Sequence, residues 1–391
     1  MGMLSGMRVL DLSMRLPGPF CTLMLADHGA DVILVTPPGQ ESMNPFTGEP
    51  PGLSAYERYL NRGKRSLSLN LKLPAGREVF MRLAATADVV VEGFRPGVAA
   101  RLGVDSETLR TAFPSLIYCS ISGYGQDDPR ARLAGHDIDY LAWSGVLGLN
   151  GVSGGAPVPL PVQAGDIFGG SMMAVTAILM ALFARQRTGS GATLDVPMTD
   201  GAMTLLALQA PHQLAGDGPQ PSRGEMPLSG AFPCYDLYRC GDGGYLAVGA
   251  LEPVFWGRLM EALNLTELAW GQFATGEDGL LVRESVTSAL AARSRDNWME
   301  ILGPVDCCVA PVLSLDEALN HPIARSRGMI VNVPSPLGGH DRQLGVPFLC
   351  DGARPTPSAA PRMGQHSDGI LQSLGYDAAA IQVLRHDEVT G

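Results

Sequence analysis

The sequence predicts an α/β protein in which a mostly parallel sheet covered by helices is followed by a smaller α+β domain. Three observations support this prediction. The chain has 391 residues, more than one small core usually organises. Its first 200 residues alternate short β-type runs with helical patterns, the order that builds parallel sheets. A polar, turn-rich stretch near residues 215–230 then separates this half from a second group of strands and helices.

Each element of the first half has its own signal. Strands are expected where β-branched and aliphatic residues cluster, at residues 8–12, 31–35, 66–71, 88–92, 116–121 and 192–196. Helices are expected at residues 19–28, 74–87 and 170–185. Pro74 suits the first turn of the second helix, and Gly189 and Gly191 end the third. This alternation is what predicts parallel strands with crossover helices.

The second half predicts a different arrangement. Residues 234–239 and 245–248 flank a Gly-Asp-Gly-Gly turn and read as a hairpin, and helices follow as far as residue 302. Proline and glycine return over residues 335–363, which predicts a long return crossing. The last helix is expected at residues 367–374.

Composition excludes several classes of protein. The formal net charge is −11, so nucleic acid is not an expected partner, because phosphate binding needs a basic surface. Seven cysteines without a CxxC pair, and opening residues without a secretory pattern, predict a reducing, cytoplasmic location. The apolar run 167–184 is marginal in length for a membrane span and is predicted to be a core helix.

One pair of residues carries most of the chemical information. His136 lies in a Gly-His-Asp run at 135–137, and Asp166 follows 30 residues later, before a long apolar stretch. An imidazole and a carboxylate can exchange protons with opposite faces of one substrate carbon. Simpler interpretations stay open: Asp166 is a good helix N-cap, and His136 could be a structural loop histidine.

The sequence around this pair resembles family III of the CoA-transferases, and in particular its α-methylacyl-CoA racemase branch. The resemblance spans nearly the whole chain, and each of its motifs alone would be weak. The motifs occur in order at residues 4–12, 18–19, 25–32, 61–65, 92–98, 122–126, 186–191, 195–201, 249–255, 310–318 and 364–376.

The resemblance implies a specific architecture. Residues 1–200 and 335–391 would form a Rossmann-like, CoA-binding large domain built from both ends of the chain. Residues 225–330 would form the small α+β domain, with 201–224 and 331–363 as linking or crossing segments. Two chains would thread through each other as an interlocked homodimer.

The resemblance also implies three catalytic residues. The aspartate matching Asp166 is a nucleophile in the transferases and a base in the racemases, and the racemase branch has a histidine where this chain has His136. A glutamate matching Glu252 pairs with that histidine; without the resemblance, Glu252 before Pro253 reads as a solvated loop carboxylate. The backbone N–H groups at the helix start beside Asp166 are expected to receive an enolate oxygen.

The CoA part of the substrate is expected to bind near a basic cluster and a glycine-rich loop. Arginine and lysine in an otherwise acidic chain suit the phosphates of CoA. The residues implied for CoA binding are Arg62, Gly63, Lys64, Arg65, Arg95, Gly135, Asp137 and Tyr140, with Arg58 nearby. One departure affects this site, because Thr36-Pro37-Pro38 stands where the family usually has an acidic residue followed by arginine.

These observations predict an isomerase that inverts the α-carbon of 2-methyl-branched acyl-CoA thioesters, an activity of lipid metabolism. His136, supported by Glu252, would serve one face and Asp166 the other. No metal or organic cofactor is expected, because the thioester itself acidifies the α-proton and CoA is part of the substrate. The alternatives are a CoA-transferase with Asp166 as nucleophile, and a catalytically silent protein that binds CoA thioesters.

Overall fold

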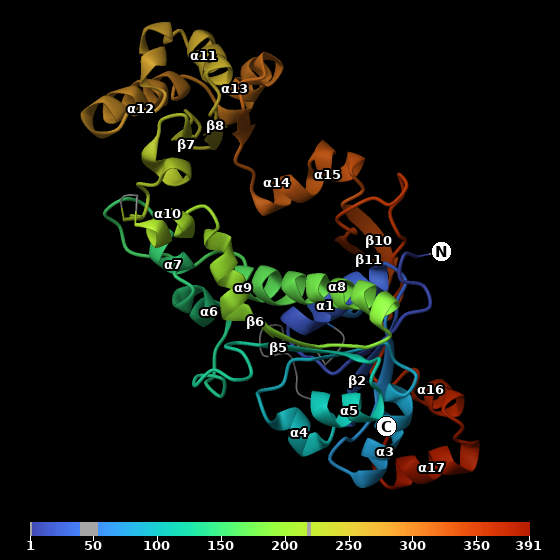
Figure 1. Cartoon of the computed structure of the whole chain (residues 1–391). Coiled ribbons are helices and arrows are strands. Elements are labelled where there is room, and N and C mark those ends of the chain that lie inside the picture. The colour runs from blue at the N-terminus through green and yellow to red at the C-terminus, as the bar shows by residue number, and fades with distance from the viewer. Residues whose placement is uncertain (1, 40–53, 217–219) are drawn as a thin grey trace. The chain divides into compact units, whose positions relative to one another are not determined.

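The computed structural model of the chain describes residues 2–39, 54–216 and 220–391, so part of the predicted linker, residues 217–219, lies outside the described residues (Figure 1). The described chain divides into two compact units. The first unit comprises the described residues within Met1–Ser144, Leu160–Leu206 and Pro322–Gly391, and the second those within Gly145–Pro159 and Ala207–His321.

A six-stranded sheet, with every strand pair parallel, forms the centre of the first unit. Its spatial order is β3-β2-β1-β4-β5-β6, the order of the doubly wound Rossmann fold. The strands are β1 (Arg8–Asp11), β2 (Asp31–Thr36), β3 (Arg65–Ser68), β4 (Val89–Glu92), β5 (Ile117–Ser122) and β6 (Thr193–Pro197). The prediction of a mostly parallel sheet is confirmed, and the strand order reverses between β1 and β4.

Helices cover both faces of this sheet (Figure 1). On one face, alternate strand residues such as Leu10 and Val90 pack against Phe80 of α3 and against the C-terminal residues Leu371 and Leu384. On the other face, Val9 and its equivalents pack against α1 and α8. The covering helices are α1 (Pro17–Asp27), α3 (Pro74–Ala84), α5 (Ser106–Ala112), α8 (Met173–Thr188), α16 (Ser367–Ser373) and α17 (Ala378–His386). The C-terminal segment therefore joins the N-terminal one in a single core, as predicted.

The remaining elements of the first unit are short. They are α2 (Ala55–Asn61), α4 (Val98–Leu102), α6 (Asp137–Trp143), η1 (Gly165–Met172), α9 (Met198–Met203), η2 (Thr204–Leu206), α15 (Pro322–Ser326), and the hairpin β10 (Ile330–Pro334) and β11 (His340–Leu344). The hairpin falls largely within the segment expected to be a crossing. Helix α17 was not expected from the sequence; Asp377 caps it by accepting the Ala380 N–H at 2.8 Å.

The predicted core helix starts earlier than expected. It begins at Gly165 as the π-helical turn η1 and continues as α8, and together they form the one described helix that is long and apolar enough to span a membrane. One side of α8, including Ala174, Ile178 and Ala181, is buried against the sheet. Packing of this kind is what a core helix of an α/β domain requires.

Close packing fixes η1 against α9. A Cβ atom added to Gly169 would lie 2.5 Å from the Met198 carbonyl oxygen and 2.8 Å from the Ala202 nitrogen. One added to Gly201 would lie 2.5 Å from the Gly169 Cα. Only glycine permits the two backbones to approach this closely, so this contact sets the position of the turn that carries Asp166.

The second unit is an α+β structure around a three-stranded antiparallel sheet, as predicted. Its strands are β7 (Tyr235–Arg239), β8 (Tyr245–Gly249) and β9 (Val309–Pro311). Its helices are α7 (Val146–Leu149), α10 (Ala210–Ala215), η3 (Pro227–Ala231), α11 (Pro253–Ala262), η4 (Thr266–Gly271), α12 (Gly276–Leu290), α13 (Arg295–Leu302), η5 (Gly303–Val305) and α14 (Leu315–Asn320). Trp256 and Leu259 of α11 and Val286 of α12 are central to its core.

Candidate active site

Asp166 lies inside the first turn of η1, with its side chain half-buried. The residue at the N-cap position is Ala164, and no side chain of the helix's own N-cap closes this end. The interpretation of Asp166 as a helix N-cap is therefore wrong. A carboxylate inside the turn, with no capping bond to make, is available for other chemistry.

A different carboxylate caps this turn. The backbone N–H of Asp166 donates to Asp137 Oδ1 at 2.9 Å, and the Gly165 N–H also hydrogen-bonds to the Asp137 carboxylate. The N–H of the next residue, Ile167, donates to the Gln163 carbonyl at 2.9 Å. These N–H groups are already occupied within the chain. The expectation that they receive an enolate oxygen is wrong, because each donor has one proton and a partner for it.

The surroundings of Asp166 favour its protonated form. Burial, followed by the negative charge of Asp137, raises the pKa of this carboxyl to about 7, and the positive charge of Arg15 opposes them. Burial together with the charge of Asp166 also raises the pKa of Tyr56 and of Tyr140, each to about 12. A carboxyl with a pKa near 7 can both accept and release a proton at neutral pH.

His136 is the N-cap residue of α6, and its side chain is exposed. Its backbone N–H donates to Asp139 Oδ2 at 2.9 Å, which closes the first turn of the helix. Because the next residue, Asp137, hydrogen-bonds to the backbone at Asp166, the segment carrying His136 lies beside the turn carrying Asp166. The fold therefore brings together two of the three predicted catalytic segments.

Tyr140 and Gly135 form part of the wall of this site. The Tyr140 side chain is buried, its hydroxyl donates to the Gly135 carbonyl at 2.7 Å, and its ring contacts that of Tyr124 edge-on at 5.4 Å. A Cβ atom on Gly123 would lie 2.6 Å from this ring, and one on Gly135 2.7 Å. The glycines thus accommodate the tyrosine, which holds the loop after β5 against α6.

Two exposed arginines follow the strands at which the sheet order reverses. Arg15 lies in the loop after β1 and Arg95 in the loop after β4. Open α/β sheets bind ligands at this reversal, outside the carboxyl ends of the strands. The charge of Arg95 acts on Tyr140, and that of Arg15 on Asp166, so both cations belong to the candidate site.

Arg15 is the residue that the sequence analysis missed. Its φ of +69° is in the left-handed region, which a non-glycine residue adopts at a cost and which is frequent at functional sites. The available signal was its position, directly after the first strand of a Rossmann-like sheet. The hydroxyl of Tyr56, from α2, donates to the Arg15 carbonyl at 3.2 Å and contributes to the same corner.

The cations of the basic cluster at residues 58–65 form ion pairs with carboxylates of the same chain. Every one of its four cations has a carboxylate partner: Arg58 with Asp341 (2.7 Å), Arg62 with Asp27 (2.7 Å), Lys64 with Asp11 (3.1 Å) and Arg65 with Asp31 (2.6 Å). The Arg62 and Lys64 side chains are 1% and 0% exposed. A phosphate role stays a prediction for these residues, and burial disfavours it for Arg62 and Lys64. Gly63, with φ +74°, makes the turn between them.

Glu252 belongs to the second unit, where it is the N-cap residue of α11 and its side chain is exposed. Its carbonyl accepts the N–H groups of Phe255 (3.0 Å) and Trp256 (3.1 Å). Burial and the Glu252 charge raise the pKa of the neighbouring Cys308 thiol. The pairing of Glu252 with His136 stays a prediction.

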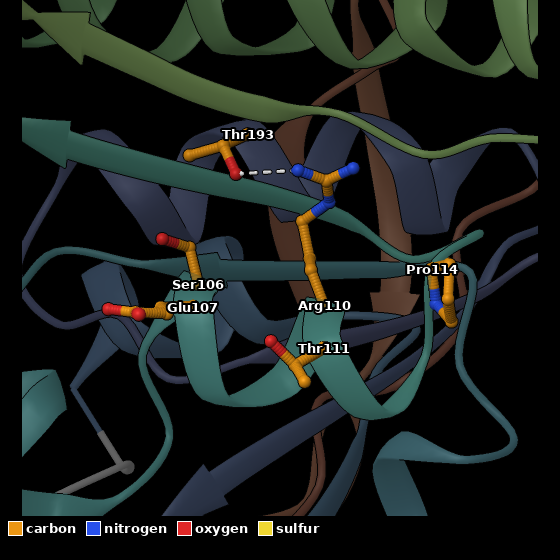
Figure 2. Close-up of a pocket in the computed structure, with 6 residues that line it drawn as sticks. All are labelled: Ser106, Glu107, Arg110, Thr111, Pro114 and Thr193. Carbon is orange, nitrogen blue, oxygen red and sulfur yellow. Dashed lines mark hydrogen bonds between the residues drawn. The ribbon is translucent and has the colours of Figure 1, made fainter.

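Two cavities are formed by residues outside the predicted site. One of about 790 Å³, within the second unit, is lined by residues of β7 and β8 together with Cys308 and Ser229. The other, of about 390 Å³, lies by α5 and β6; Figure 2 shows Arg110 reaching across it to the Thr193 hydroxyl at 3.2 Å. None of the predicted site residues lines either cavity.

Metal chemistry has no evident site in the described ranges. Within residues 2–39, 54–216 and 220–391, no three His, Cys, Asp or Glu side chains gather in an arrangement that could hold a metal ion.

Known proteins and one family model are similar to this chain in sequence or in fold. The model of the family "CoA-transferase family III" matches residues 4–367. The chain is 36% identical to an alpha-methylacyl-CoA racemase of Mus musculus, over 99% of this chain and 97% of the relative. It is 35% identical to a succinyl-CoA:mesaconate CoA-transferase of Haloarcula marismortui, over 99% of this chain and 100% of the relative. A CAIB/BAIF family protein from Brucella suis superposes with a TM-score of 0.80 at 31% identity, covering 95% of this chain and 99% of that one.

Proposed function

Because the chain belongs to CoA-transferase family III, we propose that it is a racemase of 2-methyl-branched acyl-CoA thioesters. One base removes the α-proton, the electron pair of that C–H bond passes into an enolate, and a proton returns to the α-carbon from the opposite face. His136 serves one face and Asp166 the other. No bond to the enzyme forms, and the CoA moiety leaves with the product.

The observation that carries this proposal is the environment of Asp166. Its pKa of about 7 lets the same carboxyl act as base in one direction and as acid in the other. A transferase nucleophile needs no second acid or base on the opposite face of the α-carbon, whereas the racemase scheme uses His136, whose segment lies beside the Asp166 turn. The racemase relative, 36% identical over nearly the full chain, supports the same assignment.

Supporting roles follow from the same scheme. Glu252 accepts a hydrogen bond from one ring nitrogen of His136, which fixes the tautomer and makes the other nitrogen the stronger base. Arg95, Gly135 and Tyr140 contact the CoA moiety in this scheme. The active form is an interlocked homodimer in the cytoplasm, where its cysteines, all seven of them free thiols in the structure, remain reduced.

Isotope exchange tests the proposal. A single enantiomer of a 2-methylacyl-CoA, incubated with the full chain in D₂O, should take up α-deuterium and drift to both enantiomers with no added carboxylic acid. Turnover that requires a second carboxylate and proceeds without α-exchange would overturn it. In that case Asp166 would form a thioester with CoA, which hydroxylamine traps and mass spectrometry locates.

A further inference from the structure

Asp137 connects the two proposed bases through the backbone. It directly follows His136, the N-cap residue of α6, and its Oδ1 accepts the Asp166 N–H at 2.9 Å across 29 residues of sequence. A second carboxylate in the same helical turn, that of Asp139, is directed back to the His136 N–H at 2.9 Å. The two carboxylates of the α6 turn therefore have different partners, and only Asp137 reaches η1.

The start of η1 is shaped to receive this carboxylate. A Cβ atom added to Gly165 would lie 3.0 Å from Asp137 Oδ1 and 3.3 Å from the Asp137 carbonyl oxygen. Glycine at 165 therefore leaves the space in which the carboxylate meets the N–H groups. Asp137 performs for η1 the capping that Ala164, at the N-cap position, has no polar side chain to perform.

We propose that Asp137 is a positioning residue for the proposed racemase reaction: its carboxylate holds the Asp166 turn beside His136 and places a second negative charge next to the Asp166 carboxylate. This inference rests on the proposed function. It assigns Asp137 a role through Asp166, in place of the contact with CoA that the family resemblance implies.

The electrostatics of the site agree with this role. The side chains that interact electrostatically with Asp166 are those of Asp137 and Tyr140 in α6, Arg15 before α1, and Tyr56 in α2. Burial is the largest cause of the raised Asp166 pKa. The negative charge of Asp137 raises this pKa further, and the positive charge of Arg15 lowers it. Burial raises the pKa of Asp137 itself, and the hydrogen bonds from the Asp166 and Gly165 N–H groups act in the opposite direction.

The test compares the pH dependence of kcat/KM for racemisation in wild-type and Asp137→Asn enzyme. The amide keeps an oxygen acceptor for the N–H groups but removes the charge, so the limb set by Asp166 should move to lower pH by at least about half a unit. This is the acidic limb for the enantiomer from which Asp166 removes the proton, and the alkaline limb for the enantiomer to which it returns one. KM should stay within about twofold of the wild-type value. Asp137→Ala, which also removes the acceptor, should lose about 10²-fold in kcat.

Asp105→Asn is the matched control. Asp105 caps α5, a helix as short as α6, by accepting the Thr108 N–H at 3.0 Å, and it has no part in the site. This variant should leave the pH profile unchanged. An unshifted profile in Asp137→Asn, or a raised KM with unchanged kcat, would overturn the positioning role and favour a CoA contact. Wild-type enzyme without α-exchange would instead refute the proposed function itself.

Discussion

Lys64 and Asp11 form an ion pair from which solvent is completely excluded: Lys64 Nζ donates to Asp11 Oδ2 at 3.1 Å, and both side chains are 0% exposed. Lys64 also donates to the Pro19 carbonyl at 3.0 Å, and the Ser13 hydroxyl donates to Asp11. Asp11 ends β1, and Pro19 lies in the first turn of α1. The pair therefore joins the carboxyl end of β1 to the start of α1, beside the candidate site.

Lys64→Met should be strongly destabilising. Removing one partner leaves the other charge buried and unpaired, which costs about 3–5 kcal/mol. Urea unfolding measures this loss. The control is Arg82→Gln, which breaks an exposed pair with Glu78 and a cation–π contact with Tyr376, and it should cost at most about 1 kcal/mol. If Lys64→Met instead folds with unchanged stability and loses affinity for CoA, the predicted phosphate role of Lys64 is correct.

His136→Ala and Asp166→Ala should each abolish racemisation, because inversion needs a donor opposite the acceptor. We expect losses of about 10²–10⁴-fold in kcat, measured by polarimetry or chiral chromatography. Each variant should still exchange the α-proton of one enantiomer with solvent through its remaining base, with opposite preferences. Near-normal racemisation by His136→Ala would show that this histidine is only structural.

Glu252→Gln should lower kcat about 10–100-fold while the protein remains folded, as judged by circular dichroism. The amide keeps the hydrogen-bonding shape but removes the charge that stabilises the imidazolium. Glu261→Gln, near the other end of α11, is the control and should retain full activity. Equal effects of the two substitutions would exclude a specific pairing of Glu252 with His136.

Asp166→Asn should stabilise the protein at neutral and alkaline pH. The folded carboxyl keeps its proton up to a pKa of about 7, whereas the unfolded one loses it near 3.8. Folded wild-type protein therefore binds more protons between these values, and its stability falls as pH rises through that window. The neutral amide of Asp166→Asn has no such loss. Above pH 7 the free energy of unfolding of the variant should therefore exceed that of wild type by about 1–3 kcal/mol.

Urea unfolding at several pH values checks this prediction. The difference between Asp166→Asn and wild type should be largest above about pH 7 and vanish as pH approaches about 4, where both side chains are neutral in the folded state. A constant difference across this range would mean that burial does not perturb Asp166.

Most of the fold was predictable because its signals are local. Short β-branched runs followed by helical patterns predict parallel strands wherever they occur, and all six predicted strands of the large sheet are present within a few residues of their expected ends. Among the helices that cover the sheet, α5 and α17 are the exceptions. The buried apolar residues of α17, Ile381 and Leu384, are few, and only the sheet face on which they pack makes them part of a core.

The sequence by itself determined the family, the doubly wound fold and the segments of His136 and Asp166, which the fold brings side by side. Only the tertiary structure decided which partners the neighbouring polar residues bind. Asp137 proved to be the acceptor for the Asp166 backbone, and Lys64 proved to be matched by Asp11, 53 residues away. Propensity and periodicity describe residues within a few turns of one another, whereas the partner of a buried charge or N–H group is chosen by the packing of distant segments.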